Sequence, residues 1–165
     1  SVLVVIHTGA LQVLLLERVV PAGFWQSVTG SLEPGESPLQ AAVRELEEET
    51  GLVVPPERLR DWHRTTRFEI LEAWRARFAP GVTHNTEHVF SLCVDEPRPV
   101  RLAATEHRAQ LWLPCDEAAH KASSWTNREA IQQLCEAGAQ KPSAQGQRPS
   151  SAADAVSKAF RQSRQ

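Results

Sequence analysis

Six charged residues crowd the segment between positions 36 and 49. Five of them are carboxylates and one is a guanidinium: Glu36, Glu45, Glu47, Glu48, Glu49 and Arg44. Carboxylates this close together repel one another, so the segment must either face open solvent or bind cations. A solvated acidic helix face is the ordinary interpretation of such a run.

The spacing of these residues favours the cation. Residues 38–50 are predicted to form a helix that Gly51 ends. Glu45, Glu48 and Glu49 then lie one turn apart, where their oxygens can share hard divalent ions such as Mg²⁺, with Mn²⁺ as a substitute. The apolar face of this helix is predicted to carry Leu39, Ala42, Val43 and Leu46.

A glycine-containing loop precedes this helix. Gly30 and the Pro34-Gly35 pair allow the chain to fold tightly over whatever the helix holds. Glu36 enters near the helix start, where the helix dipole favours negative charge.

The remaining pattern predicts mostly strands with two main helices, an α+β mixed sheet covered by helices. A turn at Thr8-Gly9 joins the first two strands into a hairpin. Thr126 and Glu129 form a capping-box pattern that would start the second helix, and Gly138 would end it. The predicted strands are 2–6, 12–16, 24–29, 59–67, 69–78, 87–94 and 110–113.

Length and composition predict one domain over 1–138 and a flexible, low-complexity tail over 139–165, in which 153–161 could form a weak helix. A net charge of −2 provides no basic field for nucleic acid, and no apolar run reaches membrane-spanning length. Three cysteines without metal-ligand spacing predict reduced thiols in a cytoplasmic protein. The absence of Met suggests a trimmed amino terminus.

The order of residues from Gly30 to Leu52 resembles the box of the Nudix hydrolases, which hydrolyse a nucleoside diphosphate linked to another moiety. Gly30 is followed after five residues by Glu36, and after seven more by Arg44-Glu45-Leu46. Glu48-Glu49 and Gly51-Leu52 then complete the box. The resemblance implies the Nudix fold, in which helices sandwich a mixed sheet around a loop-helix-loop box.

The resemblance also implies the roles of the charged residues. Glu45, Glu49 and Glu106 would be the metal ligands, and Glu106 would come from a distant loop between strands. Arg44 would hold a glutamate in place. Glu48 would ligate a further metal or take the proton from the attacking water. Glu48 and Glu106 both stay open as the residue that takes this proton. An exposed loop carboxylate is the alternative for Glu106.

Several stretches outside the box resemble the branch of the family that hydrolyses dihydroneopterin triphosphate to the monophosphate and pyrophosphate in folate biosynthesis. They are 24–31, 78–83 with 85–87, 105–107, and 124–125 with 127–128. Arg18 could fork onto phosphate oxygens, or simply pair with a neighbouring carboxylate. The average burial of tryptophan predicts core positions for Trp25 and Trp125 rather than stacking on the pterin ring. The resemblance implies substrate contacts at Arg18, Thr29, Phe68, Glu69, Ile70, Leu71 and Ser124.

Two alternatives remain open at this point. A housecleaning (d)NTP pyrophosphohydrolase would carry the same box, and guanine resembles a pterin. A Nudix-fold binding module without catalysis would typically lose carboxylates of the box, and all are present here. In either enzymatic case the partner is a small-molecule triphosphate, with neither nucleic acid nor membrane, and the oligomeric state is left undetermined.

Overall fold

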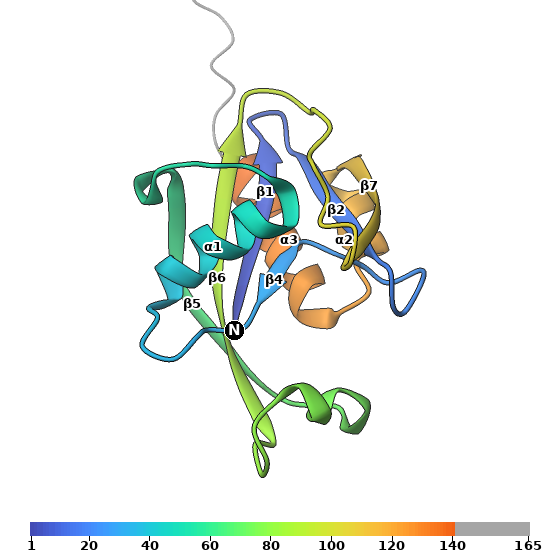
Figure 1. The fold of residues 1–165 in the computed structure, drawn as a ribbon. Coiled ribbons are helices and arrows are strands. Elements are labelled where there is room, and N and C mark those ends of the chain that lie inside the picture. The colour runs from blue at the N-terminus through green and yellow to red at the C-terminus, as the bar shows by residue number, and fades with distance from the viewer. Residues whose placement is uncertain (141–165) are drawn as a thin grey trace, which may run out of the picture.

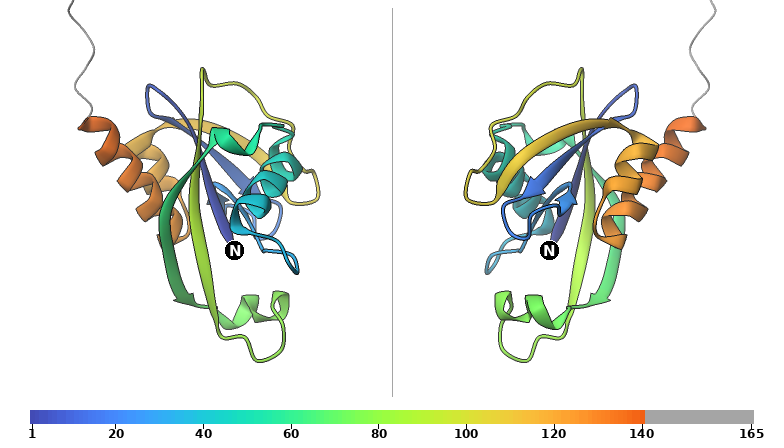
Figure 2. Two further views of the ribbon diagram at one scale, coloured as in Figure 1. Left: turned by 90° about the vertical axis from the view of Figure 1, so that its left-hand side faces the viewer. Right: turned by 90° about the vertical axis from the view of Figure 1, so that its right-hand side faces the viewer.

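The computed structural model describes residues 1–140 and shows a mixed β-sheet with helices on both faces (Figures 1 and 2). The predicted tail therefore lies almost entirely outside the described residues. The strands are β1 (Val2–Thr8), β2 (Gln12–Arg18), β3 (Trp25–Gln26), β4 (Val28–Gly30), β5 (Leu59–Glu69), β6 (His84–Val94) and β7 (His107–Pro114). The helices are α1 (Pro38–Thr50), α2 (Cys115–Lys121) and α3 (Trp125–Ala139), with short 3₁₀ helices η1 (Pro56–Arg58) and η2 (Glu72–Arg77).

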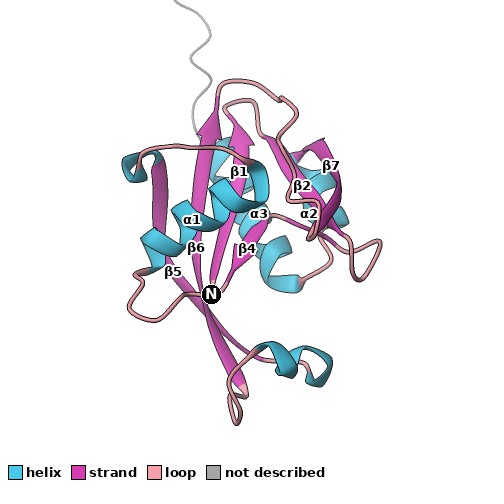
Figure 3. Ribbon diagram, in the orientation of Figure 1, coloured by secondary structure: helices cyan, strands magenta, loops and turns pink. Residues whose placement is uncertain are grey.

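The central strand β1 organises the sheet. It pairs in parallel with β6 and antiparallel with β2 and β4, while β5 extends the sheet beyond β6 and β3 and β7 both pair with β2. β1 is buried over almost its whole length because it is covered on both faces. The predicted α+β class, a mixed sheet covered by helices, is confirmed, as the arrangement in Figure 3 shows.

Two hydrophobic cores lie on opposite faces of the sheet. One packs α1 against β1, β2 and β6 through residues such as Val4, Leu46 and Phe90. The other packs α2 and α3 against the opposite face through residues such as Leu3 and Ile131. Figure 2 shows α1 on one side of the sheet and α2 with α3 on the other. Alternate residues of β1 feed the two cores, which fixes the register of the strand.

Most predicted elements are confirmed, with corrections at their ends. The hairpin between β1 and β2 forms as expected. Residues 24–29 form two short strands with different partners instead of one, because β3 pairs with β2 and β4 pairs with β1. No prediction anticipated α2. No helix within residues 1–140 has the length and apolar character needed to cross a bilayer.

The predicted strand over 69–78 is wrong. β5 ends at Glu69, and η2 follows in the loop before β6. Trp74 holds this helix against the β2–β3 end, since its ring lies 5.7 Å from Phe24 and under the guanidinium of Arg18 at 5.5 Å. Contacts distant in the sequence therefore decide the conformation of this segment, and its own periodicity does not.

The predicted ends of the second helix are also wrong. Ser124 is the N-cap of α3 and accepts a hydrogen bond from the amide of Asn127, so the helix starts before the expected Thr126 cap. At the other end α3 passes through Gly138 and continues to Ala139.

Two of the three cysteines are joined, contrary to the expectation of free thiols. Cys115 at the start of α2 and Cys135 in α3 form a disulfide, and their Cα atoms lie 5.8 Å apart. Cys93 is free and exposed. The sequence separation hid this pair, because it becomes close only when α2 and α3 pack together.

Candidate active site

The helix α1 presents the carboxylates, and its ends are set by local sequence. Ser37 and Gln40 form a reciprocal capping box, and Pro38 occupies the first turn, where its missing N–H costs nothing. Gly51 ends the helix with φ of 68°, a left-handed conformation that favours glycine, and its N–H bonds the carbonyl of Glu47. The predicted bounds of this helix are confirmed.

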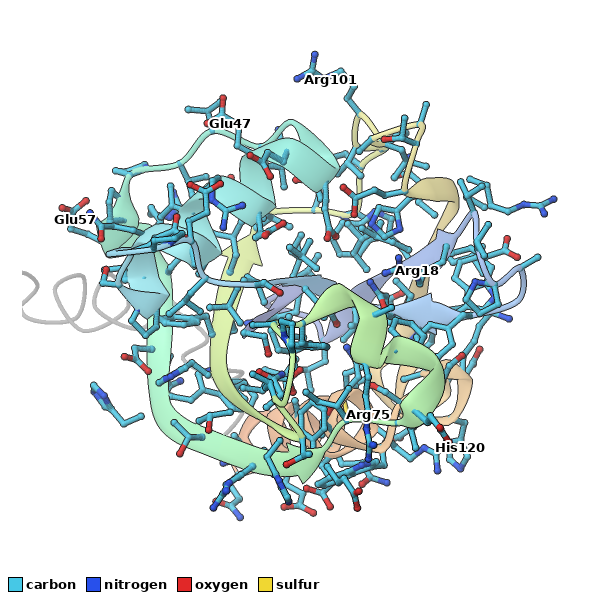
Figure 4. All side chains as sticks on the ribbon, turned by 60° about the horizontal axis from the view of Figure 1, so that its bottom comes forward. Arg18, Glu47, Glu57, Arg75, Arg101 and His120 are labelled. Atoms are coloured by element: carbon cyan, nitrogen blue, oxygen red, sulfur yellow. A yellow bond between two sulfur atoms is a disulfide. The ribbon has the colours of Figure 1, made fainter. Side chains whose placement is uncertain are left out.

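The buried face of α1 differs from the purely apolar face that was predicted. Leu39 is exposed, whereas Glu45 and Glu49 are buried beside Leu46. Glu48 faces solvent with 54% of its side chain exposed. Glu47 is exposed, and Figure 4 shows it at the periphery of the molecule.

Arg44 holds this group together. Its guanidinium forks onto Glu36 with two bonds of 2.9 Å, donates to Glu45 at 2.8 Å and reaches Glu48 at 3.2 Å. A further bond of 2.9 Å to the carbonyl of Ser31 ties the glycine-containing loop to the helix. The hydrogen bonds from Arg44 hold the pKa of Glu36 below its usual value. The bond to Glu36 likewise raises the pKa of Arg44, which keeps the guanidinium charged.

Burial dominates the electrostatics of the two inner carboxylates. It raises the pKa of Glu45 to about 7, although the hydrogen bond from Arg44 acts in the opposite direction. Burial also raises the pKa of Glu49, whose side chain is 1% exposed, against a lowering by the hydrogen bond from His107. Burial makes the ionised form of both carboxylates costly, so a nearby positive charge would stabilise that form.

A second element approaches α1 at Glu49. His107, the first residue of β7, places its Nε2 2.9 Å from Oε2 of Glu49. Glu106, the preceding residue, is exposed, and ligand atoms of Glu49, Glu106 and His107 all lie within 4.8 Å of one another. Glu106 therefore comes to the end of the box helix from a distant part of the chain.

The donor set fits a hard divalent cation. Oε1 of Glu49 is buried and has no hydrogen-bond partner among residues 1–140, although an unpaired buried carboxylate oxygen is costly. The ligand atoms that lie within 4.8 Å of one another belong to Glu49, Glu106 and His107, and Glu45 is not part of this group because its Oε1 bonds Arg44. Carboxylate oxygens are what Mg²⁺ and related ions prefer, and a cation between Glu49 and Glu106 would satisfy the free oxygen of Glu49.

The residues expected to contact the substrate come from several elements: Arg18 ends β2, Thr29 lies in β4, residues 68–71 run from the end of β5 into the next loop, and Ser124 caps α3. Arg18 is the strand partner of His107, so it lies beside the residue that bonds Glu49. Arg18 donates from Nε to the carbonyl of Val20, and its guanidinium lies over the ring of Trp74. Thr29 Oγ1 accepts from the side-chain Nε2 of Gln26. Ser124 caps α3 through its side-chain oxygen, so that group already accepts one hydrogen bond.

The segment 68–71 places its four residues in different surroundings. Phe68 is half-buried and Glu69 is exposed in an ion pair of 3.1 Å with Arg75. Ile70 is buried, and Leu71 is exposed. The different surroundings of Phe68 and Glu69, the last two residues of β5, agree with the expectation that neighbouring strand residues point to opposite faces.

Trp125 is not a core residue, which corrects the expectation from average burial. Its side chain is 49% exposed, and its ring packs edge-on against Phe68 with centroids 6.3 Å apart. Trp25 is partly buried against the core on the α2–α3 face, and Lys121 lies over its ring. An accessible aromatic ring therefore stands at the start of α3.

Three buried polar residues were not predicted from the sequence as members of a site. They are His107, Glu87 of β6 and Asn127 of α3, and each keeps one side-chain nitrogen or oxygen without a partner among the described residues. Burial raises the pKa of Glu87. All three lie in stretches that resemble the family, at 105–107, 85–87 and 127–128, but the resemblance assigned no role to any of them.

A sheet with this topology, a capped helix bearing the complete box and a carboxylate delivered from a distant loop define a Nudix protein. The NUDIX domain family matches residues 1–134, and the chain belongs to that family. The dihydroneopterin triphosphate diphosphatase of Escherichia coli K12 is 47% identical over 137 residues, covering 81% of this chain and 90% of the relative. The protein of the same name from Haemophilus influenzae is 40% identical over 134 residues, covering 79% and 84% of the two chains.

Solved structures agree with these relatives. The E. coli dihydroneopterin triphosphate pyrophosphohydrolase superimposes with a TM-score of 0.75 at 46% identity, covering 81% of this chain and 92% of the other. The family match ends at residue 134, so it covers the carboxylate cluster and the buried residues of both cores.

Proposed function

We propose that this protein hydrolyses 7,8-dihydroneopterin triphosphate to dihydroneopterin monophosphate and pyrophosphate, a step of folate biosynthesis. The observation that carries the proposal is the meeting of Glu49 and Glu106 at the end of an intact box helix. The identity of 47% to the E. coli enzyme of that activity supports the choice of substrate.

Mg²⁺ is the expected metal, held by Glu45, Glu49 and Glu106, and Mn²⁺ can replace it because both accept oxygen ligands. When bound, the metal would neutralise charge on the phosphates and lower the pKa of coordinated water. The buried free oxygen of Glu49 and the raised pKa of Glu45 are the features of this chain that favour such an ion.

The other charged residues of the box have separate tasks. Arg44 fixes the orientations of Glu36, Glu45 and Glu48 through direct hydrogen bonds. Glu48 is exposed and next to the metal-holding face, so it can accept the proton of the attacking water. Glu106 is also exposed and can do the same, and the geometry provides no basis for preferring one of the two.

The ring of the substrate is proposed to lie near the start of α3. Trp125 offers an exposed face for stacking, and Phe68 supports its edge. Arg18 would contact the phosphates, with Thr29, Ile70, Leu71 and Ser124 around them. Glu87 now joins Glu69 as a candidate acceptor for the amide and amino edge of a pterin, because Oε1 of Glu87 is buried and unpartnered whereas Glu69 is paired with Arg75.

Guanine nucleotides are the second candidate substrates. Guanine presents the same amide and amino edge as a pterin, so a carboxylate that accepts from one accepts from the other. Hydrolysis of dGTP alongside the pterin substrate is therefore expected, at a lower kcat/KM. Adenine lacks this edge and should be a poorer substrate than guanine.

A product assay tests the proposal. The purified protein is incubated with Mg²⁺ and either 7,8-dihydroneopterin triphosphate or each of the four dNTPs, and pyrophosphate and orthophosphate are measured separately. We expect pyrophosphate and a monophosphate in one step, with the highest kcat/KM for the pterin. Stepwise release of orthophosphate alone would exclude this reaction, and a preference for a dNTP would favour the nucleotide-hydrolase alternative.

We also propose that residues 1–138 form the catalytic domain, that 139–165 are dispensable for chemistry and that the protein acts in the cytoplasm. A variant that ends after Gln140 should retain kcat and KM. The Cys115–Cys135 disulfide is uncommon in a reducing compartment, so alkylation of free thiols in fresh lysate tests the location. Full oxidation in the cell would contradict a cytoplasmic site.

A further inference from the structure

His107 is a buried histidine that contacts the box helix α1. Its partner there is the carboxylate of Glu49 and not an apolar side chain, so its position is not accounted for by hydrophobic packing alone. We propose that His107 is a positioning residue: its Nε2–H fixes Oε2 of Glu49 so that the other oxygen, Oε1, stays directed at the metal. This inference rests on the proposed function, because it assigns a role within the same metal site.

The hydrogen bond has a defined direction when Glu49 is ionised. A carboxylate then only accepts hydrogen bonds, so Nε2 of His107, at 2.9 Å, must carry the proton. The other ring nitrogen, Nδ1, is buried and has no partner among residues 1–140. A proton on that nitrogen would be a buried donor without an acceptor, which is costly. The neutral tautomer with its proton on Nε2 therefore donates to Glu49 and leaves no unpaired donor at Nδ1.

The backbone around His107 is held on two sides. The amides of Glu106 and His107 both donate to the carbonyl of Ala103, at 2.9 Å each. The carbonyl of Glu106 accepts from Val19 at 2.8 Å, and Ala103 donates to the carbonyl of Glu49 at 3.3 Å. The segment that delivers the histidine is therefore connected both to the β2 end and to the last turn of α1.

This arrangement divides two tasks between neighbouring residues. Glu106 is exposed and can reach a metal, while the side chain of His107 is completely buried and reaches only Glu49. A histidine ligand is the alternative, since its nitrogen belongs to the same group of donor atoms. Nε2 already bonds Glu49, however, and Mg²⁺ prefers oxygen to imidazole nitrogen, so positioning is the better assignment.

Two amide substitutions form a matched pair for the test. His107→Gln places an N–H donor close to the position of Nε2, whereas His107→Asn places it close to the position of Nδ1, too far from Glu49. Binding of Mn²⁺ to the substrate-free protein is measured by titration calorimetry, together with thermal unfolding. The tautomer of His107 in the unaltered, metal-free protein is read from its ring nitrogen-15 shifts.

We expect the Gln variant to bind Mn²⁺ within about threefold of the unaltered protein. The Asn variant should bind it roughly 10- to 100-fold more weakly, the usual effect of losing a residue that orients a metal ligand. At saturating Mn²⁺ the Asn variant should keep its KM for the triphosphate, because substrate contacts are intact. His120→Gln, on the exposed side of α2, is the control and should leave Mn²⁺ affinity unchanged.

Three results would overturn the assignment. Equal weakening in the Gln and Asn variants would mean that imidazole itself binds the metal. Unchanged Mn²⁺ affinity in a folded Asn variant would mean that Glu49 needs no support. An Nδ1–H tautomer would mean that Nε2 accepts from a protonated Glu49, which contradicts the proposed donation from His107 to the carboxylate. Since Mn²⁺ binding is measured without substrate, these outcomes are independent of whether the protein hydrolyses the pterin triphosphate.

Discussion

The carboxylate of Glu45 occupies the space that a side chain on Gly30 would need. A Cβ at Gly30 would overlap the Cγ and Cδ atoms of Glu45. Gly30 ends β4, and Glu45 lies in the middle of α1, so this contact packs the helix directly against the strand. The glycine of the box is thus required by a close approach and not by its backbone conformation, since its φ is not positive.

Gly30→Ala should therefore damage the metal site. The added methyl group must displace Glu45 and with it the bond to Arg44, and we expect a loss of tenfold or more in kcat/KM, about 1.4 kcal/mol or more. Gly9→Ala is the matched control, because nothing lies within 4 Å of that position and its φ is not positive. Similar kinetics for the two variants would show that Glu45 tolerates displacement.

Glu49→Gln should separate activity from stability. The substitution removes a negative charge but keeps an oxygen that can accept from His107, so kcat should fall roughly a hundredfold or more, about 2.7 kcal/mol. The melting temperature should not fall, because the fold loses a buried, partly unpaired charge.

Glu47→Gln is the control for this change, since Glu47 is exposed at the periphery of the molecule (Figure 4). Steady-state kinetics at saturating Mg²⁺ and thermal unfolding provide the two measurements. Normal turnover in the Glu49 variant would contradict a role for Glu49 in catalysis. An equal loss of kcat in the Glu47 variant would show that the effect is not specific to the face of α1 that carries Glu49.

Local sequence was sufficient to predict α1 because every determinant lies within the segment. Periodic apolar residues and a terminal glycine are read directly from residues 38–51. The start of α3 was harder, since Ser124 and Thr126 are both good caps and only the folded chain selects Ser124. The conformation of η2 could not be predicted, because it depends on the contact of Trp74 with Phe24.

The site divides in the same way. Glu45, Glu48 and Glu49 could be grouped from helical spacing alone. Glu106 entered only through resemblance to the family, since no local pattern marks it. His107 was missed because its importance arises from contact with Glu49, which β7 and α1 create only when they pack. Average burial was a poor guide for Trp125, whose position at the first turn of α3 leaves it exposed.

The pKa of Glu45 predicts how the metal-free protein responds to pH. Burial raises this pKa from 4.5 to about 7, so the folded state binds the proton more tightly than the unfolded state does. The stability that this proton contributes is fully present below about pH 4.5 and is lost as pH rises through 7. As pH rises from 5 to 8, we expect the melting temperature of the Glu45→Gln variant to increase relative to that of the unaltered protein.

The same proton competes with the metal. Because ligation needs the carboxylate, Mn²⁺ affinity should fall by up to about tenfold for each pH unit below 7, with proton release on binding. Calorimetry at pH 6 and pH 8, in buffers of different ionisation enthalpy, measures both quantities. Affinity that is constant across this range would show that Glu45 is already ionised in the metal-free protein.

Glu106→Ala tests the ligand that comes from outside the box. Glu106 is exposed, so its loss should change the free energy of unfolding by no more than about 0.5 kcal/mol. Mn²⁺ affinity and kcat should each fall, by roughly tenfold or more, because one of three oxygen ligands disappears. Glu57→Ala, which removes another exposed carboxylate at the edge of the molecule (Figure 4), should leave both unchanged.

A crystal structure with metal and a non-hydrolysable substrate analogue completes this test. We expect a Glu106 oxygen to coordinate a metal that Glu45 or Glu49 also holds, directly or through one water, since donor atoms of Glu49 and Glu106 already lie within 4.8 Å. The side chain has freedom to move, because it is exposed while its backbone is fixed to Ala103 and Val19. If Glu106 pointed into solvent in that structure and the Ala variant kept full activity, the ligand outside the box would be another residue.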